Sequence, residues 1–311
     1  MSLLFNHDRC SADASALPAN ISLSRAKLYG YWELTKPRLS FLSVITAIVG
    51  YLVANPARDM EVLAALLLGT ALSAGGAGTL NQWLEREVDT RMARTRQRPI
   101  PAGIVSPRGA LVWGLVLCIG GPAVLAWGTN WLAAGLAVAT IASYLWVYTP
   151  LKQKTLWCTH VGAVPGALPP LIGWAAAEGH LGALGWILFA ILFAWQIPHF
   201  MAIAWTYRDD YATARMPMLP VVDKKGDRVV RHSTLFTWLL VIFSLLPVFM
   251  SYCTWAYGSC ALLAGVYFAV RAHAFSYEDR RQRAARQLFF ASIFYLPFVL
   301  AALVLDRWLL A

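Results

Sequence analysis

The sequence predicts an all-α integral membrane protein, and three observations support this fold class. Hydrophobic residues make up 59% of the 311 residues and charged residues only 14%, whereas a soluble domain carries about 25% charged residues. The apolar residues are gathered into long stretches that match the length of a membrane-spanning helix. Lys and Arg are concentrated in alternate links between these stretches, as in multi-pass membrane proteins.

Nine apolar stretches are long enough to be predicted as transmembrane helices. The eighth carries Arg271 and His273 near its end, and the fifth contains a Pro- and Gly-rich run that predicts a broken helix. Pro198 removes one backbone hydrogen bond from the sixth. The predicted ranges are 39–54, 62–80, 109–127, 131–149, 157–177, 181–204, 234–252, 258–274 and 288–305.

The positions of the 26 Lys and Arg residues predict the orientation of the chain. If the N-terminus is cytoplasmic, all of them except Arg58 and Arg307 fall on the cytoplasmic side. This bias accounts for most of the net charge of +10, so no nucleic-acid partner is needed to explain it. Residues 1–28 are mixed and polar, lack the parts of a signal peptide and are predicted to form a flexible cytoplasmic tail before a single transmembrane domain, 29–311.

The long links after the second and sixth helices are four helices apart and lie on the same predicted face. This spacing suggests two four-helix halves plus one further helix. Cys253 and Cys260 flank a short turn, where a disulfide is one of two alternatives if the turn lies outside the cytoplasm.

The second apolar stretch ends in three side chains that carry oxygen atoms. Asn81, Glu85 and Asp89 are spaced four residues apart, so on a helix they form one stripe that drifts by about 40° per step. Oxygen ligands with few protein carboxylates suit Mg²⁺ that also binds substrate phosphates. The alternative is an ordinary solvated helix end. The small residues of the run 73–78 just before the stripe permit close approach of another segment or a ligand.

Four arginines follow the acidic stripe directly: Arg91, Arg94, Arg96 and Arg98. Guanidinium groups bind phosphate oxygens in bidentate fashion. A complex of a metal ion with a diphosphate explains why acids and arginines are adjacent. Anchoring by cytoplasmic positive charge is the alternative and accounts for some of the four.

A second polar cluster follows the sixth apolar stretch. It comprises Gln196, His199, Thr206, Asp209 and Asp210. On a helix His199, Thr206 and Asp210 lie on roughly one face, and polar residues at membrane depth are costly and usually functional. His199 has an alternative interpretation as a structural residue that is hydrogen-bonded to a neighbour.

A third pair lies at the cytoplasmic end of the fourth stretch. Tyr148 and Lys152 are four residues apart. They either belong to an interfacial belt with a snorkelling lysine or face the same pocket and contact a phosphate. His160, in the fifth stretch, is by itself weak evidence for a haem or metal ligand.

Taken together, these motifs resemble the UbiA-type intramembrane prenyltransferase superfamily. More narrowly, five motifs in order across about residues 30–305 resemble the protohaem IX farnesyltransferase branch of that superfamily. They are LTKPRLS, NQWLEREVDTRMARTRQRPIPAG, YTPLKQKT, GALPPLIGWAA and the run from WQIPHFMAIAW through DDY to MPMLP.

The resemblance implies a reaction and its partners. Farnesyl diphosphate, bound through Mg²⁺, would alkylate a vinyl group of haem b, water would add, and haem O and diphosphate would form. Haem b is then a substrate and not a permanent cofactor. The implied setting is a bacterial inner membrane with the site facing the cytoplasm, and the implied partners are membrane lipid and a haem A synthase or a terminal oxidase assembly.

The resemblance also implies roles for individual residues. Asn81, Glu85 and Asp89 would hold the first Mg²⁺, and Asp210 with Asp209 would support a second metal or the diphosphate. Thr206 departs from the superfamily pattern, which usually has Asp there, so the ligands of a second metal are open. His199 would serve the haem or a metal. The residues expected to bind diphosphate are Arg38, Arg94, Arg98, Lys152 and Tyr148.

Three other functions are alternatives. The same chemistry could act on a quinone-precursor aromatic acid. A membrane transporter also has broken helices and intramembrane polar groups, but its polar groups gather at the midplane, whereas these gather at one face. A non-catalytic haem-handling protein would show no dependence on Mg²⁺.

Overall fold

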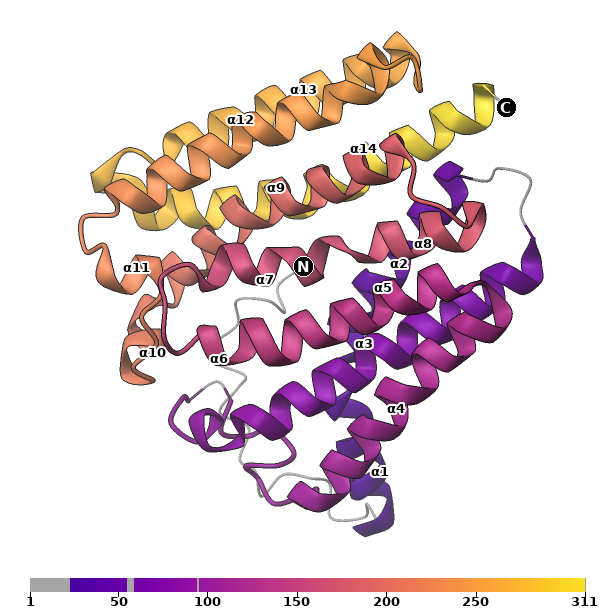
Figure 1. Ribbon diagram of the computed structural model, residues 1–311. Coiled ribbons are helices and arrows are strands. Elements are labelled where there is room, and N and C mark those ends of the chain that lie inside the picture. The colour runs from indigo at the N-terminus through magenta and orange to yellow at the C-terminus, as the bar shows by residue number, and fades with distance from the viewer. Residues whose placement is uncertain (1–22, 55–58, 94, 311) are drawn as a thin grey trace.

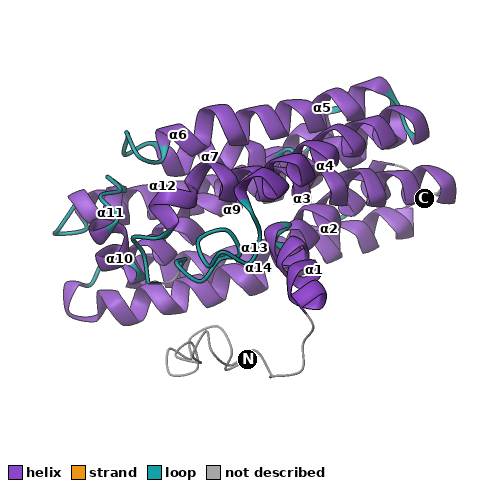
Figure 2. Ribbon diagram, turned by 90° about the horizontal axis from the view of Figure 1, so that it is seen from below, coloured by secondary structure: helices purple, strands orange, loops and turns teal. Residues whose placement is uncertain are grey.

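The computed structural model describes residues 23–54, 59–93 and 95–310, and within these ranges the chain is helical and contains no β-strand. Figure 1 shows long helices that run side by side, with the C-terminus at one end of the bundle. Figure 2 shows the same bundle after a quarter turn, with helices joined by loops throughout. The predicted all-α class is therefore confirmed for this part of the chain.

The helices follow one another with short connections. In the first part of the chain they are α1 (Leu23–Leu34), α2 (Pro37–Ala54), α3 (Met60–Asp89), α4 (Pro107–Gly128), α5 (Trp131–Ala142), the π-helical turn η3 (Ser143–Tyr148) and α6 (Thr149–Leu151). In the second part they are α7 (Cys158–Ala167), α8 (Pro169–Glu178), α9 (Ala183–Thr206), α10 (Arg208–Thr213), α11 (Leu219–Val222), α12 (Asp227–Phe249), α13 (Trp255–Ala274), the 3₁₀ turn η4 (Glu278–Arg280) and α14 (Arg281–Leu310).

Every predicted apolar stretch is helical, and seven helical segments are long and apolar enough to cross a membrane. These seven are α2, α3, α4, the run from α5 to α6, α9, α12 and the run that ends in α14. The chain is therefore a multi-pass membrane protein. The broken pair α7–α8 and the helix α13 do not meet the same criterion, so the count of nine spans and the orientation of the N-terminus stay predictions.

Local signals in the sequence explain where several helices begin. The side chain of Asp59 accepts hydrogen bonds from the backbone at Glu61 and Val62 and caps α3. Ser106 caps α4 in the same way, and Asn130 caps α5. The fifth predicted stretch is broken at Leu168, between α7 and α8, because two consecutive prolines follow and cannot donate backbone hydrogen bonds. The predicted broken helix is confirmed.

Two separate apolar clusters hold the bundle together. One is built from α2, α3, α4, α5 and α8, and the other mainly from α9, α12, α13 and α14. The broken helix α7–α8 contributes to both clusters. It crosses α2 closely, because a Cβ at Gly50 would overlap the carbonyl of Pro170, and a Cβ at Gly173 would overlap that of Ala47. The fold thus has two helical groups, and the broken helix lies between them.

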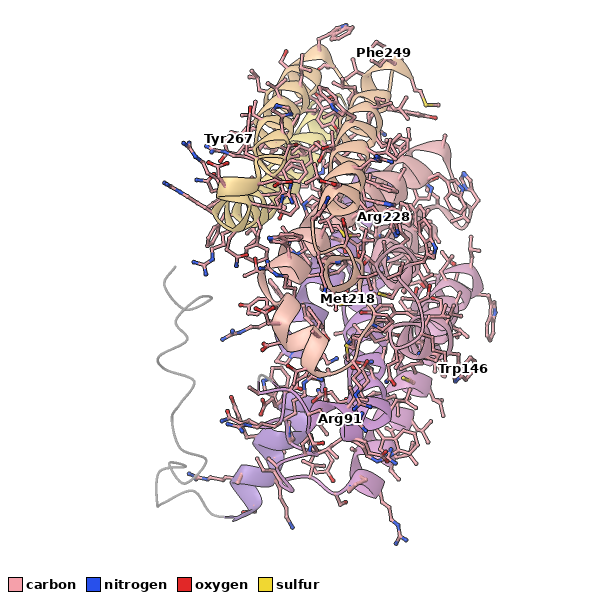
Figure 3. All side chains as sticks on the ribbon, turned by 90° about the vertical axis from the view of Figure 1, so that its left-hand side faces the viewer. Arg91, Trp146, Met218, Arg228, Phe249 and Tyr267 are labelled. Atoms are coloured by element: carbon pink, nitrogen blue, oxygen red, sulfur yellow. The ribbon has the colours of Figure 1, made fainter. Side chains whose placement is uncertain are left out.

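The two long links, residues 90–106 (the first link) and 207–226 (the second link), lie at the same end of the bundle (Figure 1). They pack together through a small apolar cluster, the link cluster, that joins Met92 to Tyr211, Met216 and Met218 and also includes Cys158. Figure 3 shows this end of the molecule, with Arg91, Met218 and Arg228 labelled. Segments more than 100 residues apart are thereby brought next to one another.

Two predictions about the chain need correction or delimitation. Residues 23–28, predicted to belong to the flexible tail, form the first turns of α1, and the rest of that tail lies outside the described residues. The alternative of a disulfide between Cys253 and Cys260 is wrong, because both thiols are free. The helix α13 begins at Trp255, so Cys260 is already more than one turn into the helix and away from the turn that holds Cys253.

Candidate active site

The last turns of α3 carry the three predicted metal ligands. Asn81, Glu85 and Asp89 lie within the helix and are buried, with 2%, 2% and 0% of their surface exposed. The alternative of a solvated helix end is therefore wrong for these three, although Glu87 between them is exposed. The C-terminal end of a helix carries partial negative charge, which disfavours carboxylates. Buried acids at this position consequently need cations beside them.

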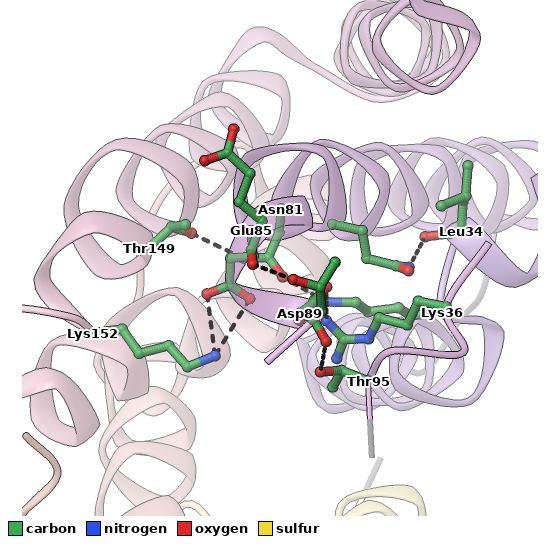
Figure 4. Close-up of polar contacts among 12 residues, drawn as sticks. Leu34, Lys36, Asn81, Glu85, Asp89, Thr95, Thr149 and Lys152 are labelled. Atoms are coloured by element: carbon green, nitrogen blue, oxygen red, sulfur yellow. Dashed lines mark hydrogen bonds and ion pairs between the residues drawn. The ribbon is translucent and has the colours of Figure 1, made fainter. Parts of the chain in front are cut away.

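Three cations supply that charge, two of them, Lys36 and Lys152, from distant parts of the chain (Figure 4). The Lys152 amine donates to both carboxylate oxygens of Glu85, at 3.2 and 3.4 Å. The Arg98 guanidinium donates to Asp89 Oδ2 at 2.6 Å, and the Lys36 amine donates to Asn81 Oδ1 at 2.6 Å. Each predicted ligand thus has its own cation: Lys36 from the turn before α2, Arg98 from the first link and Lys152 from the turn after α6.

The side chain of Asn81 is held by hydrogen bonds at both ends of its amide. Its Nδ2 donates to Thr149 Oγ1 at 3.1 Å, and the Thr149 hydroxyl donates to the carbonyl of Tyr144 at 2.8 Å. Because Thr149 is in α6, this chain of bonds fixes the end of α3 to the end of the fourth span. The amide oxygen therefore points toward Lys36 and the carboxylates.

Asp89 holds an oxygen atom that has no partner. Its Oδ2 pairs with Arg98, and its backbone carbonyl accepts from the Thr95 hydroxyl at 2.9 Å. Its Oδ1 is buried and accepts no hydrogen bond from the described residues. A buried unsatisfied polar atom costs about 1–3 kcal/mol and calls for an explanation such as a bound ion.

The residues around Asp89 fit a magnesium ion. Two carboxylates and one amide oxygen are hard ligands, and a small number of them leaves coordination positions for water and phosphate oxygens, as Mg²⁺ prefers. Among the described residues no group of three or more His, Cys, Asp or Glu is gathered for a metal. The site is therefore suited to a metal that shares its ligands with a substrate and less suited to an ion held by protein alone.

Lys36 is a member of the site that the sequence analysis missed. It has φ of 48°, which is uncommon for a residue with a side chain, and it precedes Pro37. The aliphatic stem of Lys36 passes beside Gly78 of α3, and a Cβ at Gly78 would lie in ordinary van der Waals contact with it, at 3.5 Å. Lys36 belongs to the same KPR stretch as Arg38, which the sequence analysis named as a diphosphate-binding residue. Arg38 is exposed and makes no hydrogen bond or ion pair with the described residues.

The cations of the site affect one another. Burial, and secondly the positive charge of Arg98, lower the pKa of Lys36 to about 7. Burial acts most strongly and lowers the pKa of Lys152, but the Glu85 carboxylate together with Tyr211 and Tyr144 outweighs it, so the pKa of Lys152 is raised. Lys152 is thereby held in its charged form beside Glu85, where it can also meet an anion.

The second acidic motif, Asp209 and Asp210, is more exposed than the stripe at the end of α3. The side chain of Asp209 is 98% exposed and 4.0 Å from Arg208, and that of Asp210 is half-buried and makes no hydrogen bond with the described residues. Thr206 donates to the carbonyl of Ala202 one turn earlier. Tyr211 is the residue of this motif that turns inward, into the link cluster and close enough to Lys152 to interact with its charge.

His199 contacts α14 and not the acidic stripe. Its Nδ1 is 2.7 Å from Ser292 Oγ, and its ring stacks on Trp195 at 4.7 Å and on Phe289 at 5.2 Å between centroids. These contacts are those of the structural alternative, in which the histidine is bonded to a neighbour. Its predicted role toward the haem or a metal is untested.

The remaining predicted residues are placed as follows. Tyr148 is half-buried, stacks on Tyr144 at 5.4 Å and packs against the backbone at Gly162. Arg91 and Arg96 are exposed, as the anchoring alternative predicts. Arg94 lies outside the described residues.

Comparison with known families and proteins assigns most of the chain. The model of the UbiA prenyltransferase family matches residues 43–294. The protoheme IX farnesyltransferase of Opitutus terrae is 54% identical over 284 residues, which cover 91% of this chain and 96% of that protein. The mitochondrial protoheme IX farnesyltransferase of Arabidopsis thaliana is 42% identical and covers 89% of this chain and 64% of its own length.

Solved structures share the fold at low sequence identity. A digeranylgeranylglyceryl phosphate synthase superimposes with a TM-score of 0.78 at 18% identity, over 90% of this chain and 98% of that one. A UbiA homologue from Archaeoglobus fulgidus bound to GPP and Mg²⁺ gives a TM-score of 0.64 at 15% identity, over 88% of this chain and 99% of that one.

Proposed function

The chain belongs to the UbiA prenyltransferase family, and from that premise we propose that it transfers a farnesyl group from farnesyl diphosphate to a vinyl group of haem b. Water adds in the same reaction, and the products are haem O and diphosphate. Relatives named protoheme IX farnesyltransferase, at up to 54% identity over nine-tenths of the chain, support this choice of donor and acceptor.

One observation carries the proposal. The end of α3 gathers two buried carboxylates, an amide and three cations at one face of the bundle, and the Oδ1 atom of Asp89 has no partner among the described residues. A solvated anchor does not need this arrangement. A site that binds a metal and a diphosphate together does, because the acids hold the metal and the cations hold the free phosphate oxygens.

Asn81, Glu85 and Asp89 would hold Mg²⁺, which when bound supplies charge stabilisation to the leaving diphosphate. Lys36, Arg98 and Lys152 lie beside these ligands. They would stabilise the negative charge that develops on the diphosphate as the carbon–oxygen bond breaks. Arg94, Arg38 and Tyr148 are retained as further diphosphate contacts, and Asp210 with Asp209 as the support of a second metal or of the diphosphate. A haem-side role of His199 stays a prediction, and its hydrogen bond to Ser292 favours the structural alternative.

The surroundings of the site suit the organic half of the reaction. The farnesyl fragment becomes an allylic cation that must meet the vinyl carbon before bulk water, and the link cluster closes the site on the side of the second link. Tyr144 and Tyr148 stack near Lys152, and aromatic faces of this kind stabilise a nearby cation.

We further propose that the chain crosses a bacterial inner membrane nine times, with the N-terminus and the site on the cytoplasmic side. The seven apolar segments, and the placement of both Lys- and Arg-rich long links at the same end, support this topology. The C-terminus would then lie outside.

The proposal is tested by incubating the purified protein in detergent with haem b, farnesyl diphosphate and Mg²⁺ and analysing the porphyrins by mass spectrometry. We expect a Mg²⁺-dependent product heavier than haem b by one farnesyl group plus water. Omission of Mg²⁺, with a chelator present, is the control. Prenylation of 4-hydroxybenzoate in place of haem would contradict the acceptor but retain the metal site. Absence of both products from a folded protein would contradict the enzymatic function.

A further inference from the structure

A second polar pocket lies at the same end of the bundle as the acidic stripe but is lined by other residues. Its volume is about 270 Å³. It lies between α7, α11 and the start of α12, and its lining includes Trp157, His160, Leu219, Arg228, Arg231 and His232. The turn 152–157 takes part in both sites, since Lys152 reaches Glu85 and Trp157 lines the pocket.

The two histidines of this pocket lack hydrogen-bond partners. Their rings face one another at 5.0 Å between centroids. Both ring nitrogens of His160 and the Nδ1 of His232 are buried and unpaired among the described residues. A neutral imidazole carries one donor and one acceptor, so a satisfied core histidine would use them. Buried polar atoms that remain unpaired indicate a ligand.

The charge of the pocket decides which kind of ligand it takes. Arg228 and Arg231 line it one helical turn apart, and neither forms an ion pair with an acidic side chain of the described residues. No acidic residue of the described chain lines the pocket. Two guanidinium groups repel a metal cation, and they bind carboxylates or phosphates well. Both arginine side chains are exposed, so they can reach a ligand at the mouth of the pocket, and their charge favours an anion over a cation.

An apolar aromatic row leads away from this charged pocket. The His160 ring contacts Phe236 at 5.3 Å, and the contacts continue through Phe193 and Phe189 to Trp186, at 5.7–6.1 Å between centroids. The row runs along α9 and α12, and its phenylalanines are partly exposed. A ligand that fits both parts has a flat apolar body and carboxylates at one edge.

We propose that this pocket binds the carboxylate edge of the acceptor, which under the proposed function means the two propionates of haem b. Arg228 and Arg231 bind the carboxylates, and the histidine N–H groups complete their hydrogen bonds. The porphyrin ring lies against the aromatic row. The acceptor is thus held by groups separate from those that hold the diphosphate, so this inference rests on the proposed function for the identity of the ligand only.

The test compares haem b with its dimethyl ester, in which both propionates are neutral. Binding of each to the purified protein is measured by titration of the Soret absorbance, with the full-length chain and with Arg228→Gln, Arg231→Gln and the double variant. Arg283→Gln, an exposed arginine near the start of α14, is the matched control. The thermal unfolding temperature of every variant establishes that it is folded, and farnesyl diphosphate binding with Mg²⁺ is measured on each variant as a separate readout.

We expect the full-length chain to bind haem b about tenfold more tightly than the ester, since charge-assisted bonds to carboxylates are of that strength. Each single variant should reduce the ratio of the ester's Kd to the Kd of haem b. The double variant should bring this ratio near one without changing farnesyl diphosphate binding. The Arg283→Gln variant should retain the full ratio.

Several results would overturn the inference. An unchanged ratio in the double variant, with haem O still formed, places the propionates elsewhere and leaves the proposed function intact. Weaker farnesyl diphosphate binding in the arginine variants, with the haem ratio unchanged, assigns the pocket to the diphosphate. Zn²⁺ binding that is lost in His160→Ala, with the haem ratio again unchanged, assigns it to a metal. If the full-length chain does not bind haem b, haem b is not the acceptor, and both the proposed function and this inference are contradicted.

Discussion

At the end of α3 two acids, Glu85 and Asp89, are buried against cations, whereas in the second acidic motif Asp209 faces outward and Asp210 is half-buried. Glu85 and Asp89 are each paired with a cation inside the protein, but Asp209 is 98% exposed. Both motifs place acids at the end of a long apolar helix, at the same end of the bundle. The difference shows that residue type and spacing do not settle the role of a carboxylate; its burial and its partner do.

The largest expected effect comes from Asp89, and it tests whether the buried motif carries the chemistry. Asp89→Asn keeps the size of the side chain but removes the charge next to Arg98. We expect kcat/KM for haem O formation to fall about 10³-fold, the range seen when a group that stabilises developing charge is lost. Asp209→Asn is the matched control and should change the rate by about twofold or less, as exposed charges do. Equal losses in both variants would contradict the comparison.

Glu85 and Lys152 should act as one unit. We expect Glu85→Gln and Lys152→Gln each to lower kcat/KM about 10²-fold, because each leaves a buried charge without its partner. The double variant should lose much less than the product of the two, since residues that act together are not additive. A complete double-mutant cycle measures this, and additive losses would show that the ion pair seen here has no part in turnover.

Asp210 tests whether the second acidic motif contributes to turnover. It is half-buried, so we expect Asp210→Asn to lower the rate by about tenfold, between the effects at Asp89 and Asp209. The rate should be measured over a range of Mg²⁺ concentrations. A loss as large as that in Asp89→Asn, partly restored by high Mg²⁺, would show that the second motif also binds a metal needed for turnover. The contrast between the two motifs would then be wrong.

Lys36 and Arg38 provide a test within a single turn of the chain. Lys36→Met should raise the KM for farnesyl diphosphate about tenfold, the strength of one charge-assisted hydrogen bond. The KM for haem b should stay the same. Arg38→Met should have a smaller effect, about twofold, because that side chain is exposed. A larger increase in KM for Arg38→Met than for Lys36→Met would support Arg38 as the residue that binds diphosphate.

At His199 we expect a small effect on turnover and a larger effect on stability. Its hydrogen bond to Ser292 and its stacking on Trp195 and Phe289 predict a structural role. We expect His199→Ala to lower the stability of the protein by about 2 kcal/mol, seen as a lower thermal unfolding temperature, with activity reduced about threefold or less. Ser292→Ala should shift the unfolding temperature in the same direction. A large loss of activity without a change in unfolding temperature would assign His199 a direct part in the reaction.

Much of the fold followed from the sequence because the bilayer simplifies the problem. A spanning segment must be apolar and must satisfy its own backbone, so helices α2, α4 and α9 could be located within a few residues. The broken helix followed from Pro169 and Pro170, whose missing N–H groups no neighbour can replace. The start of α1 was missed, because a short helix that carries Arg25 and Lys27 at its start has the composition of a tail.

Part of the site also followed from the sequence. The stripe of Asn81, Glu85 and Asp89 depends only on helical periodicity. The adjacency of acids and arginines predicted a shared metal and diphosphate site, but not the direct ion pairs of Glu85 with Lys152 and Asp89 with Arg98. Lys36 was missed because its approach to Asn81 depends on a positive φ and joins residues 45 positions apart in the chain. The pocket between His160 and His232 joins residues 72 positions apart, and no local pattern marks such a pair.

The sequence by itself determined that the chain is a helical membrane protein, that its acids gather at one face, and which motifs resemble a known family. Periodicity and hydropathy are local properties, so they can be read along the chain. Only the tertiary structure decided which acids are buried, which cation lies beside each, and that the two long links meet around Met92 and Tyr211. These outcomes depend on contacts between distant segments, where packing and the cost of burying charge determine which partners meet.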